Sequence, residues 1–282
     1  MWSRAGVKER SKKMMSQNYF KMLIVGIILV ISEAGFNNIR SLESLIDELF
    51  VKHTYGYVEL DAQIALITVG IAMIGFLVLN PLSVGVWKYY IDLNRDGHSD
   101  FSKLKFGFER DNYKSIVKSL FRRDLYLIFW GLFLIASKVI ASSLTNAYII
   151  EASYGTLINI VFGIPFTILL WSKILEYMLV PLILVDKPNI ENSEPVRLSS
   201  KLMNRNKWDV FVYYLSFMGW SILIGMVVLF LIVAIRDSVA LILSLPLLTL
   251  LIPYINGGIA EIYEILIEYS DFNFKSEKKD VI

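Results

Sequence analysis

The sequence predicts an all-α membrane protein: a polytopic helical bundle of six transmembrane helices arranged as three hairpins, plus a cytoplasmic interfacial amphipathic helix. Hydrophobic residues make up 55% of the chain and its mean hydropathy is +0.54. A soluble domain holds roughly 45–50% apolar residues even with glycine counted. Several runs of about 18 or more residues carry few or no charges, which is the length that crosses a bilayer core. Lysine and arginine gather on alternate connections between these runs.

We expect residues 1–282 to form a single integral membrane domain. The six spans are expected, in order, at about residues 19–36, 62–91, 124–144, 154–185, 208–235 and 238–269. The interfacial helix is expected at about residues 101–121. Several spans are longer than a perpendicular crossing requires, so we expect tilt, a kink or an extension into the cytoplasm.

The first span follows a basic segment, a pattern that is also typical of a secretory signal peptide. No small-x-small cleavage site follows its apolar run, and further spans come later in the chain. We therefore expect residues 19–36 to form an uncleaved first helix.

The distribution of basic residues predicts the orientation. All but four of the 28 lysines and arginines lie in the segments 1–21, 88–124 and 173–209 or in the tail after residue 270. The exceptions are Arg40, Lys52, Lys138 and Arg236. Because loops rich in lysine and arginine stay on the cytoplasmic side, we expect a multi-pass protein of the cell membrane with both termini in the cytoplasm.

The stretch DLNRDGHSD (92–100), after the second span, resembles the first half of a calcium loop, with acidic or amide residues at alternate positions before a glycine. Position 12 of such a loop should be a bidentate glutamate, but here it is Lys103. We therefore predict a turn at Asp96–Gly97, with Ser99 or Asp100 capping the helix that follows. Calcium binding is the alternative.

The expected interfacial helix has apolar residues at helical spacing, with lysine and arginine between them. The apolar residues are Phe101, Leu104, Phe108, Tyr113, Ile116, Val117 and Leu120. Such a basic amphipathic helix suits the inner headgroup region, where it anchors the loop. The alternative is a sensor of anionic lipid or a dock for a partner. Gly107 and the pair Asp111–Asn112 are expected to break it into two pieces.

The second, fourth and sixth spans each carry a proline late in the apolar run, at Pro81, Pro181 and Pro253. Proline breaks or kinks a helix, and in a bilayer the freed carbonyl must lie against protein or a cavity. The third and fifth spans both start with an aspartate, Asp124 and Asp209, which we expect to cap their helices. The shared pattern indicates three helical hairpins in sequence, a parallel repeat.

Charged residues inside spans are candidate functional residues, because each costs about 2.5–3.5 kcal/mol or more at the bilayer centre. Lys173 and Glu176 share one face of the fourth span and can pair. In the sixth span Glu261 is expected in the interior, neutralised by Lys88 or Lys173, whereas Glu264 is expected near the inner water boundary. These charges are interpreted either as a relay or substrate contact, or as structural ion pairs.

Composition excludes several functional classes. Because the chain has no cysteine, disulfides, thiolate catalysis and iron–sulfur clusters are excluded. The net charge of +2 argues against nucleic-acid binding. His53 and His98 lie far apart, so no metal site is expected, and no cofactor is implied. The sequence has no nucleophile elbow, HExxH motif or phosphate-binding glycine loop, so we expect no enzyme.

Several motifs together resemble a known family. They are RLSSKLMNRNKWDVF (197–211), LSFMGW (215–220), PY followed by AEIYE (253–264), NPLSVGVWKYY (80–90) and FSKLKFGF (101–108). The chain is similar over most of residues 15–265 to the integral membrane family catalogued as domain of unknown function 975. The resemblance implies a multi-pass inner bundle, found mainly in Gram-positive bacteria, and implies no activity.

We expect a non-catalytic membrane protein that acts through partners, as an accessory, stress, secretion or immunity factor. Its expected partners are membrane lipids and other membrane proteins. The alternative is a small transporter or permease for an amphipathic or lipid-like molecule, because proline-broken helices and interior charges are typical of transporters. A polar cavity reaching Lys173, Glu176 or Glu261 would favour transport, whereas a packed centre with apolar lateral grooves would favour partner binding.

Overall fold

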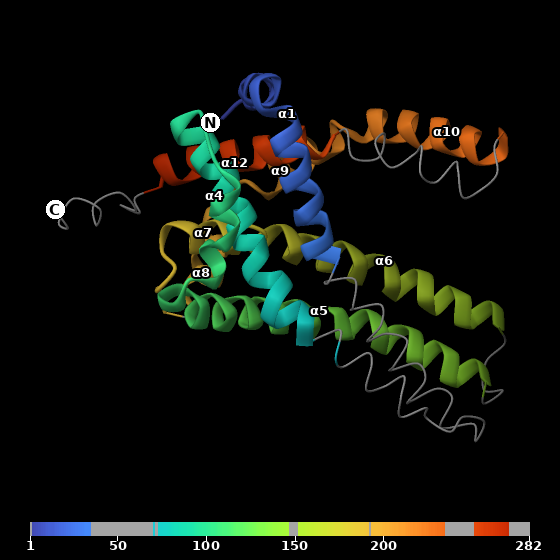
Figure 1. The fold of residues 1–282 in the computed structure, drawn as a ribbon. Coiled ribbons are helices and arrows are strands. Elements are labelled where there is room, and N and C mark those ends of the chain that lie inside the picture. Colours follow the sequence, from blue (N-terminus) through green and yellow to red (C-terminus); the bar gives the residue numbers. More distant parts are fainter. Residues whose placement is uncertain are drawn as a thin grey trace.

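The computed structural model describes residues 2–34, 70, 73–146, 152–191, 193–234 and 251–270, and these residues form an all-α structure without a strand (Figure 1). The helices are α1 (Arg4–Ala34), the π-helix η3 (Gly75–Leu79), α4 (Asn80–Asp96), the 3₁₀ helix η4 (Phe101–Phe108), α5 (Arg110–Asn146), α6 (Ala152–Tyr177), α7 (Val180–Asp186), α8 (Glu194–Met203), α9 (Lys207–Leu215), α10 (Met218–Ala234) and α12 (Ile252–Glu268). The all-α class predicted from the sequence is confirmed.

The buried core forms around α4, which contacts α1, α7 and α12. Tyr89 and Tyr90 of α4 and Tyr263 of α12 are fully buried there. Tyr90 donates a hydrogen bond of 2.7 Å to the backbone carbonyl of Met22 in α1, so its hydroxyl is satisfied inside the core. Helices that are far apart in the chain are therefore held together in one packed body.

Two glycines bring η4 into backbone contact with α4. A Cβ atom on Gly85 would lie 2.2 Å from the carbonyl oxygen of Leu104, and one on Gly107 would lie 2.0 Å from the carbonyl oxygen of Pro81. No other residue fits such a close approach without moving a backbone. Residues 101–108 are thus tied to the protein core.

The interfacial helix predicted at residues 101–121 is not a separate element. Its first part is η4, the chain turns at Glu109, and its second part is the start of α5, which runs on without a break into the third predicted span. The second part of its apolar stripe packs against protein: Ile116 and Leu120 are fully buried, while Lys118 is exposed. Phe101 and Phe108 in the first part remain exposed.

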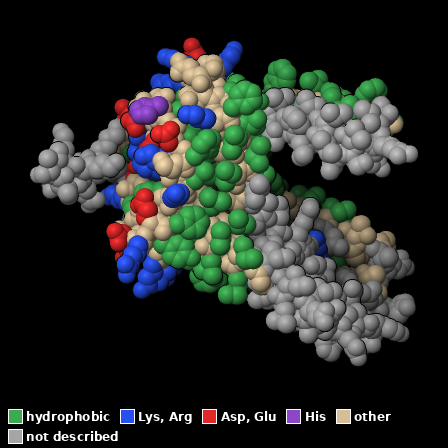
Figure 2. Space-filling model, in the orientation of Figure 1, with side chains coloured by type: hydrophobic (Ala, Val, Ile, Leu, Met, Phe, Trp, Pro, Cys, Tyr) green, Lys and Arg blue, Asp and Glu red, His purple; other side chains and the backbone are tan. Residues whose placement is uncertain are grey.

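Three of the described helical stretches are long and apolar enough to cross a membrane: Arg110–Thr145, Ser153–Asp186 and Lys207–Leu231. α5, α6 and α10 project toward the same side in Figure 1, and the charged side chains in Figure 2 gather toward the opposite end. Most of α10 is exposed, with Phe230 at 70% and Val233 at 80%. Apolar surface of this extent suggests membrane association.

The other three predicted spans coincide with helices that are shorter or buried, and parts of all three lie outside the described residues. The first span falls in α1 after non-helical backbone at Asn18, the second overlaps η3 and α4, and the sixth overlaps α12. α5 and α6 pack side by side, as expected for the middle hairpin, whereas α1 packs most extensively against α12 (Figure 1).

Candidate functional site

Glu176 is the centre of a polar cluster that joins α6 to α8 and α9. The residue is 7% exposed. Lys207 Nζ donates to its Oε2 at 2.6 Å and Lys173 Nζ donates to the same oxygen at 3.1 Å. Ser200 Oγ donates to Oε1 at 2.5 Å. A buried carboxylate is stable in its ionised form only with charge partners and hydrogen bonds, and these three donors supply both to Glu176.

The local sequence explains why the cluster forms at this end of α6. The helix ends one residue after Glu176, so the last carbonyls have no partner within the helix. Ser199 Oγ satisfies one of them by donating to the backbone carbonyl of Glu176 at 2.6 Å. The helical spacing of Lys173 and Glu176 predicted their pairing, but Ser200 and Lys207 lie 24 and 31 residues further along the chain, so no local pattern indicated them.

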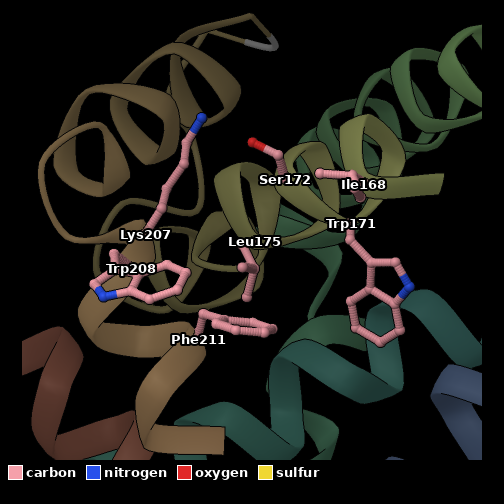
Figure 3. Close-up of a pocket in the computed structure, with 7 residues that line it drawn as sticks. All are labelled: Ile168, Trp171, Ser172, Leu175, Lys207, Trp208 and Phe211. Carbon is pink, nitrogen blue, oxygen red and sulfur yellow. The ribbon is translucent and has the colours of Figure 1, made fainter. Parts of the chain in front are cut away.

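An apolar pocket opens beside this cluster, between α6 and α9 (Figure 3). Its volume is about 450 Å³. Its lining residues are Ile168, Trp171, Ser172, Leu175, Lys207, Trp208 and Phe211. Figure 3 shows the Lys207 nitrogen and the Ser172 oxygen together at one end, with the rings of Trp208 and Phe211 at the other. Lys207 therefore belongs both to the ion-pair cluster and to the pocket.

Glu261 is buried in α12, at 3% exposure, and forms an ion pair with Arg10 of α1. The predicted neutralising residues are elsewhere: Lys88 pairs with Asp92 at 2.7 Å, and Lys173 pairs with Glu176. The sequence placed Arg10 in the basic N-terminal segment, and the packing of α1 along α12 brings it to Glu261. Glu261 and the Glu176 cluster are therefore separate sites.

A second ion-pair cluster, which the sequence analysis missed, joins the ends of α4, α7 and α12. The guanidinium of Arg95 binds both carboxylate oxygens of Asp186 at 2.7 and 2.9 Å and Oε1 of Glu264 at 2.6 Å. Tyr263 donates to Asp186 at 2.9 Å. Burial alone would lower the pKa of Arg95, but the hydrogen bonds and charges of Asp186 and Glu264 outweigh it and raise that pKa. Each helix of the cluster begins at one of the three prolines singled out in the sequence. A comparison of those three segments could have indicated the cluster.

The sequence matches one known protein family. The family described as "Protein of unknown function (DUF975)" matches residues 1–269. The chain belongs to the DUF975 family. No curated protein and no solved structure matches this DUF975 chain. The resemblance seen in the sequence is confirmed, and the match includes both ion-pair clusters and the pocket.

The three prolines of the DUF975 chain that the sequence analysis singled out begin helices. Pro81, Pro181 and Pro253 are the second residues of α4, α7 and α12, and each is preceded by irregular or π-helical backbone. Proline fits the first turn because its missing N–H has no helical partner there. Pro165, which the sequence analysis did not single out, lies inside α6.

The stretch 92–100 is mostly the end of α4. Asp92 pairs with Lys88 and also with Lys103 at 3.3 Å, so a lysine occupies the carboxylate that a calcium ion would need. Gly97 closes the helix in a left-handed conformation with φ of 73°. Asp100 occupies the N-cap position of η4, as predicted, but its side chain makes no capping hydrogen bond. Among the described residues, no group of three acidic, histidine or cysteine side chains is arranged to hold a metal.

The prediction that Asp124 caps a helix is wrong. Because α5 begins at Arg110, Asp124 lies inside this helix, and its side chain is buried. Asp124 accepts hydrogen bonds from Asn80 at 2.7 Å and from Arg123 at 2.8 Å. Asp209 lies in the first turn of α9, where an acidic residue favours the helix dipole, but the residue at the cap position is Asn206.

Proposed function

We propose that this DUF975 protein is a non-catalytic, multi-pass protein of the cell membrane that acts by holding a lipid or protein partner at the lateral surface formed by α6 and α9. The observation that carries the proposal is the apolar pocket beside the Glu176 cluster. Its residues belong to two of the long apolar helical stretches, so a component of the bilayer can reach them from the side. Roles as an accessory, stress, secretion or immunity factor all fit such holding.

The proposed topology has six spans in three hairpins, with both termini in the cytoplasm. It is supported by the concentration of lysine and arginine on alternate connections. It is also supported by the common direction of α5, α6 and α10, which project away from the charged end of the molecule (Figures 1 and 2).

The topology can be tested by cysteine labelling, because the chain has no cysteine of its own. We expect Arg205→Cys to react with a membrane-impermeant maleimide only after the cells are permeabilised, and Arg40→Cys to react in intact cells. Labelling of Arg205→Cys in intact cells would contradict the proposed orientation.

The holding role is favoured over catalysis or transport by how the ionisable groups are arranged. Glu176 receives three donors, and Glu261 is closed by Arg10. The pocket between α6 and α9 is apolar and does not reach Glu261. This is the combination of packed charges and lateral groove that partner binding requires.

Photo-crosslinking in living membranes tests the proposed function. A photoreactive amino acid at Trp208, which is 71% exposed at the pocket, should capture a membrane component. The same probe at His98, on the charged end of the molecule, serves as the matched control. If the probe at Trp208 captured no lipid or protein above the level at His98, the proposed function would be refuted.

A small transporter is the second candidate, and it is favoured by the meeting of three proline-begun helices at Arg95. In that case Glu261→Gln should impair activity while leaving expression unchanged, because it would remove an interior proton or charge relay. Under the holding role, Glu261→Gln should leave capture at Trp208 unchanged.

A further inference from the structure

The pocket between α6 and α9 has apolar walls and polar atoms at one end. Leu175, Phe211 and two tryptophans form apolar walls, while Lys207 and Ser172 place their polar atoms at one end (Figure 3). Its volume of about 450 Å³ lies within the roughly 300–1,000 Å³ typical of small-molecule sites. Its occupant must therefore combine an apolar body with a polar or charged end.

Positive charge is in excess at the polar end of the pocket. Two ammonium groups, on Lys173 and Lys207, face the single carboxylate of Glu176. The bond from Lys207 to Glu176 uses one of the three N–H donors of an ammonium group, which leaves donors for an anionic oxygen. Arg205, exposed just before α9, adds positive charge, and Asp209 in the first turn of α9 offsets part of it.

The polar end lies at the depth of a lipid headgroup in the proposed topology. Lys207 is the first residue of the apolar stretch Lys207–Leu231, so it marks where that stretch leaves the cytoplasm. Trp171 and Trp208 line the same pocket, and tryptophan favours the boundary between hydrocarbon and headgroups. Ile168, one turn before Trp171 on α6, extends the apolar wall toward the hydrocarbon.

We infer that this pocket binds an anionic phospholipid, with one acyl chain against Leu175 and Phe211 and the phosphate at Lys207. The inference rests on the proposed function and names its partner. A free phosphate ion would gain nothing from the apolar walls. A protein partner typically needs about 20–30 residues on each side, whereas seven residues on two helices line this pocket.

Tryptophan quenching by brominated lipids tests this inference on the full-length protein in vesicles. Phosphatidylglycerol and phosphatidylcholine with the same brominated acyl chains are compared at equal mole fraction in an unbrominated phosphatidylcholine background. We expect the brominated phosphatidylglycerol to quench more at low mole fraction. The excess should disappear in the double variant Trp171→Phe/Trp208→Phe, because these two of the six tryptophans line the pocket.

Two variants separate the headgroup contact from the acyl-chain contact. Lys207→Met should reduce the preference for phosphatidylglycerol about fivefold, the factor that corresponds to roughly 1 kcal/mol per lysine at an anionic surface, and Lys207→Arg should restore it. Ser172→Phe should abolish the excess quenching by filling the pocket while leaving Lys207 paired with Glu176. Lys118→Met, which removes an exposed charge from α5, is the control for general surface attraction and should change nothing.

The outcomes distinguish this inference from the proposed function. Equal quenching by the two lipids, or an excess that survives Ser172→Phe, would overturn the inference. If the probe at Trp208 then captured a protein or a second copy of this chain, the proposed function would stand with a different partner. If it captured neither lipid nor protein, both would fail. Should Lys207→Met not fold, Ser172→Phe and the double tryptophan variant decide the question.

Discussion

Gly85→Ala tests whether backbone contact between α4 and η4 holds the core together. The added methyl group would lie 2.2 Å from the carbonyl oxygen of Leu104 and 2.7 Å from its carbonyl carbon. Ordinary contact begins at 3.4 Å, so the two backbones must separate by about 1.2 Å. Because both contacting atoms belong to a backbone, no side chain can turn away to relieve the clash.

The expected loss follows from two opposing effects. Overpacking of this kind costs about 1–3 kcal/mol, and the rigid neighbour places Gly85→Ala at the upper end. Alanine regains about 0.5–1 kcal/mol in a helix relative to glycine. We therefore expect a net destabilisation of about 2 kcal/mol, which lowers the thermal midpoint by roughly 4–8 °C if each kcal/mol shifts it by about 2–4 °C.

The assay is thermal unfolding of the detergent-purified full-length protein, followed by tryptophan fluorescence. Gly131→Ala is the matched control, because a Cβ atom there would meet nothing within 4 Å in the interior of α5. It should leave the midpoint unchanged or raise it slightly. If Gly85→Ala and Gly131→Ala unfolded at the same temperature, the reasoning about close approach would be refuted.

Three further predictions concern the charged residues. Glu176→Gln should lower the free energy of unfolding by about 2–3 kcal/mol, and with it the thermal midpoint. The loss is smaller than the roughly 3–5 kcal/mol of a fully buried pair because each lysine partner is about a quarter exposed. An unchanged midpoint would contradict this. Arg95→Lys should also lower the thermal midpoint, because a lysine cannot bind Asp186 bidentately while reaching a second carboxylate. Arg197→Lys, at an exposed ion pair, is the control and should change the midpoint by close to zero. Equal effects of the two variants would argue against the cluster at Arg95. Millimolar calcium should not raise the midpoint, and Asp92→Ala should lower it with or without calcium; a calcium-dependent rise abolished by Asp92→Ala would instead support a calcium site.

Local patterns in the sequence were sufficient for the class of the protein and for several of its elements. The spans predicted at about residues 124–144, 154–185 and 208–235 overlap the three long apolar stretches, because hydrophobic length is a property of consecutive residues. The first of these stretches begins earlier than predicted, at Arg110. The spacing of Lys173 and Glu176 likewise predicted their pairing, since residues three apart share a helix face. The family followed from short motifs and is confirmed over residues 1–269.

The same local reasoning failed where an interaction depends on packing between distant segments. The apolar stripe of residues 101–121 suits a lipid surface and a protein surface equally well. Only the tertiary packing decided that Ile116 and Leu120 are covered by protein while Phe101 and Phe108 stay exposed. Asp124 stands at the start of an apolar run but in the middle of a helix, because the basic residues before it continue α5.

For the same reason, the sequence could not predict which charged residues pair over long distances in the chain. Arg10 and Glu261 are separated by 251 residues, and Arg95 lies 91 residues from Asp186. Any cation can neutralise a carboxylate in principle, so composition and spacing leave the partner open. The sequence by itself determined the all-α class, the family and the apolar helices. The tertiary packing of α1, α4, α7 and α12 decided which charges meet in the core, and the packing of α6 against α8 and α9 decided where the pocket beside Lys207 forms.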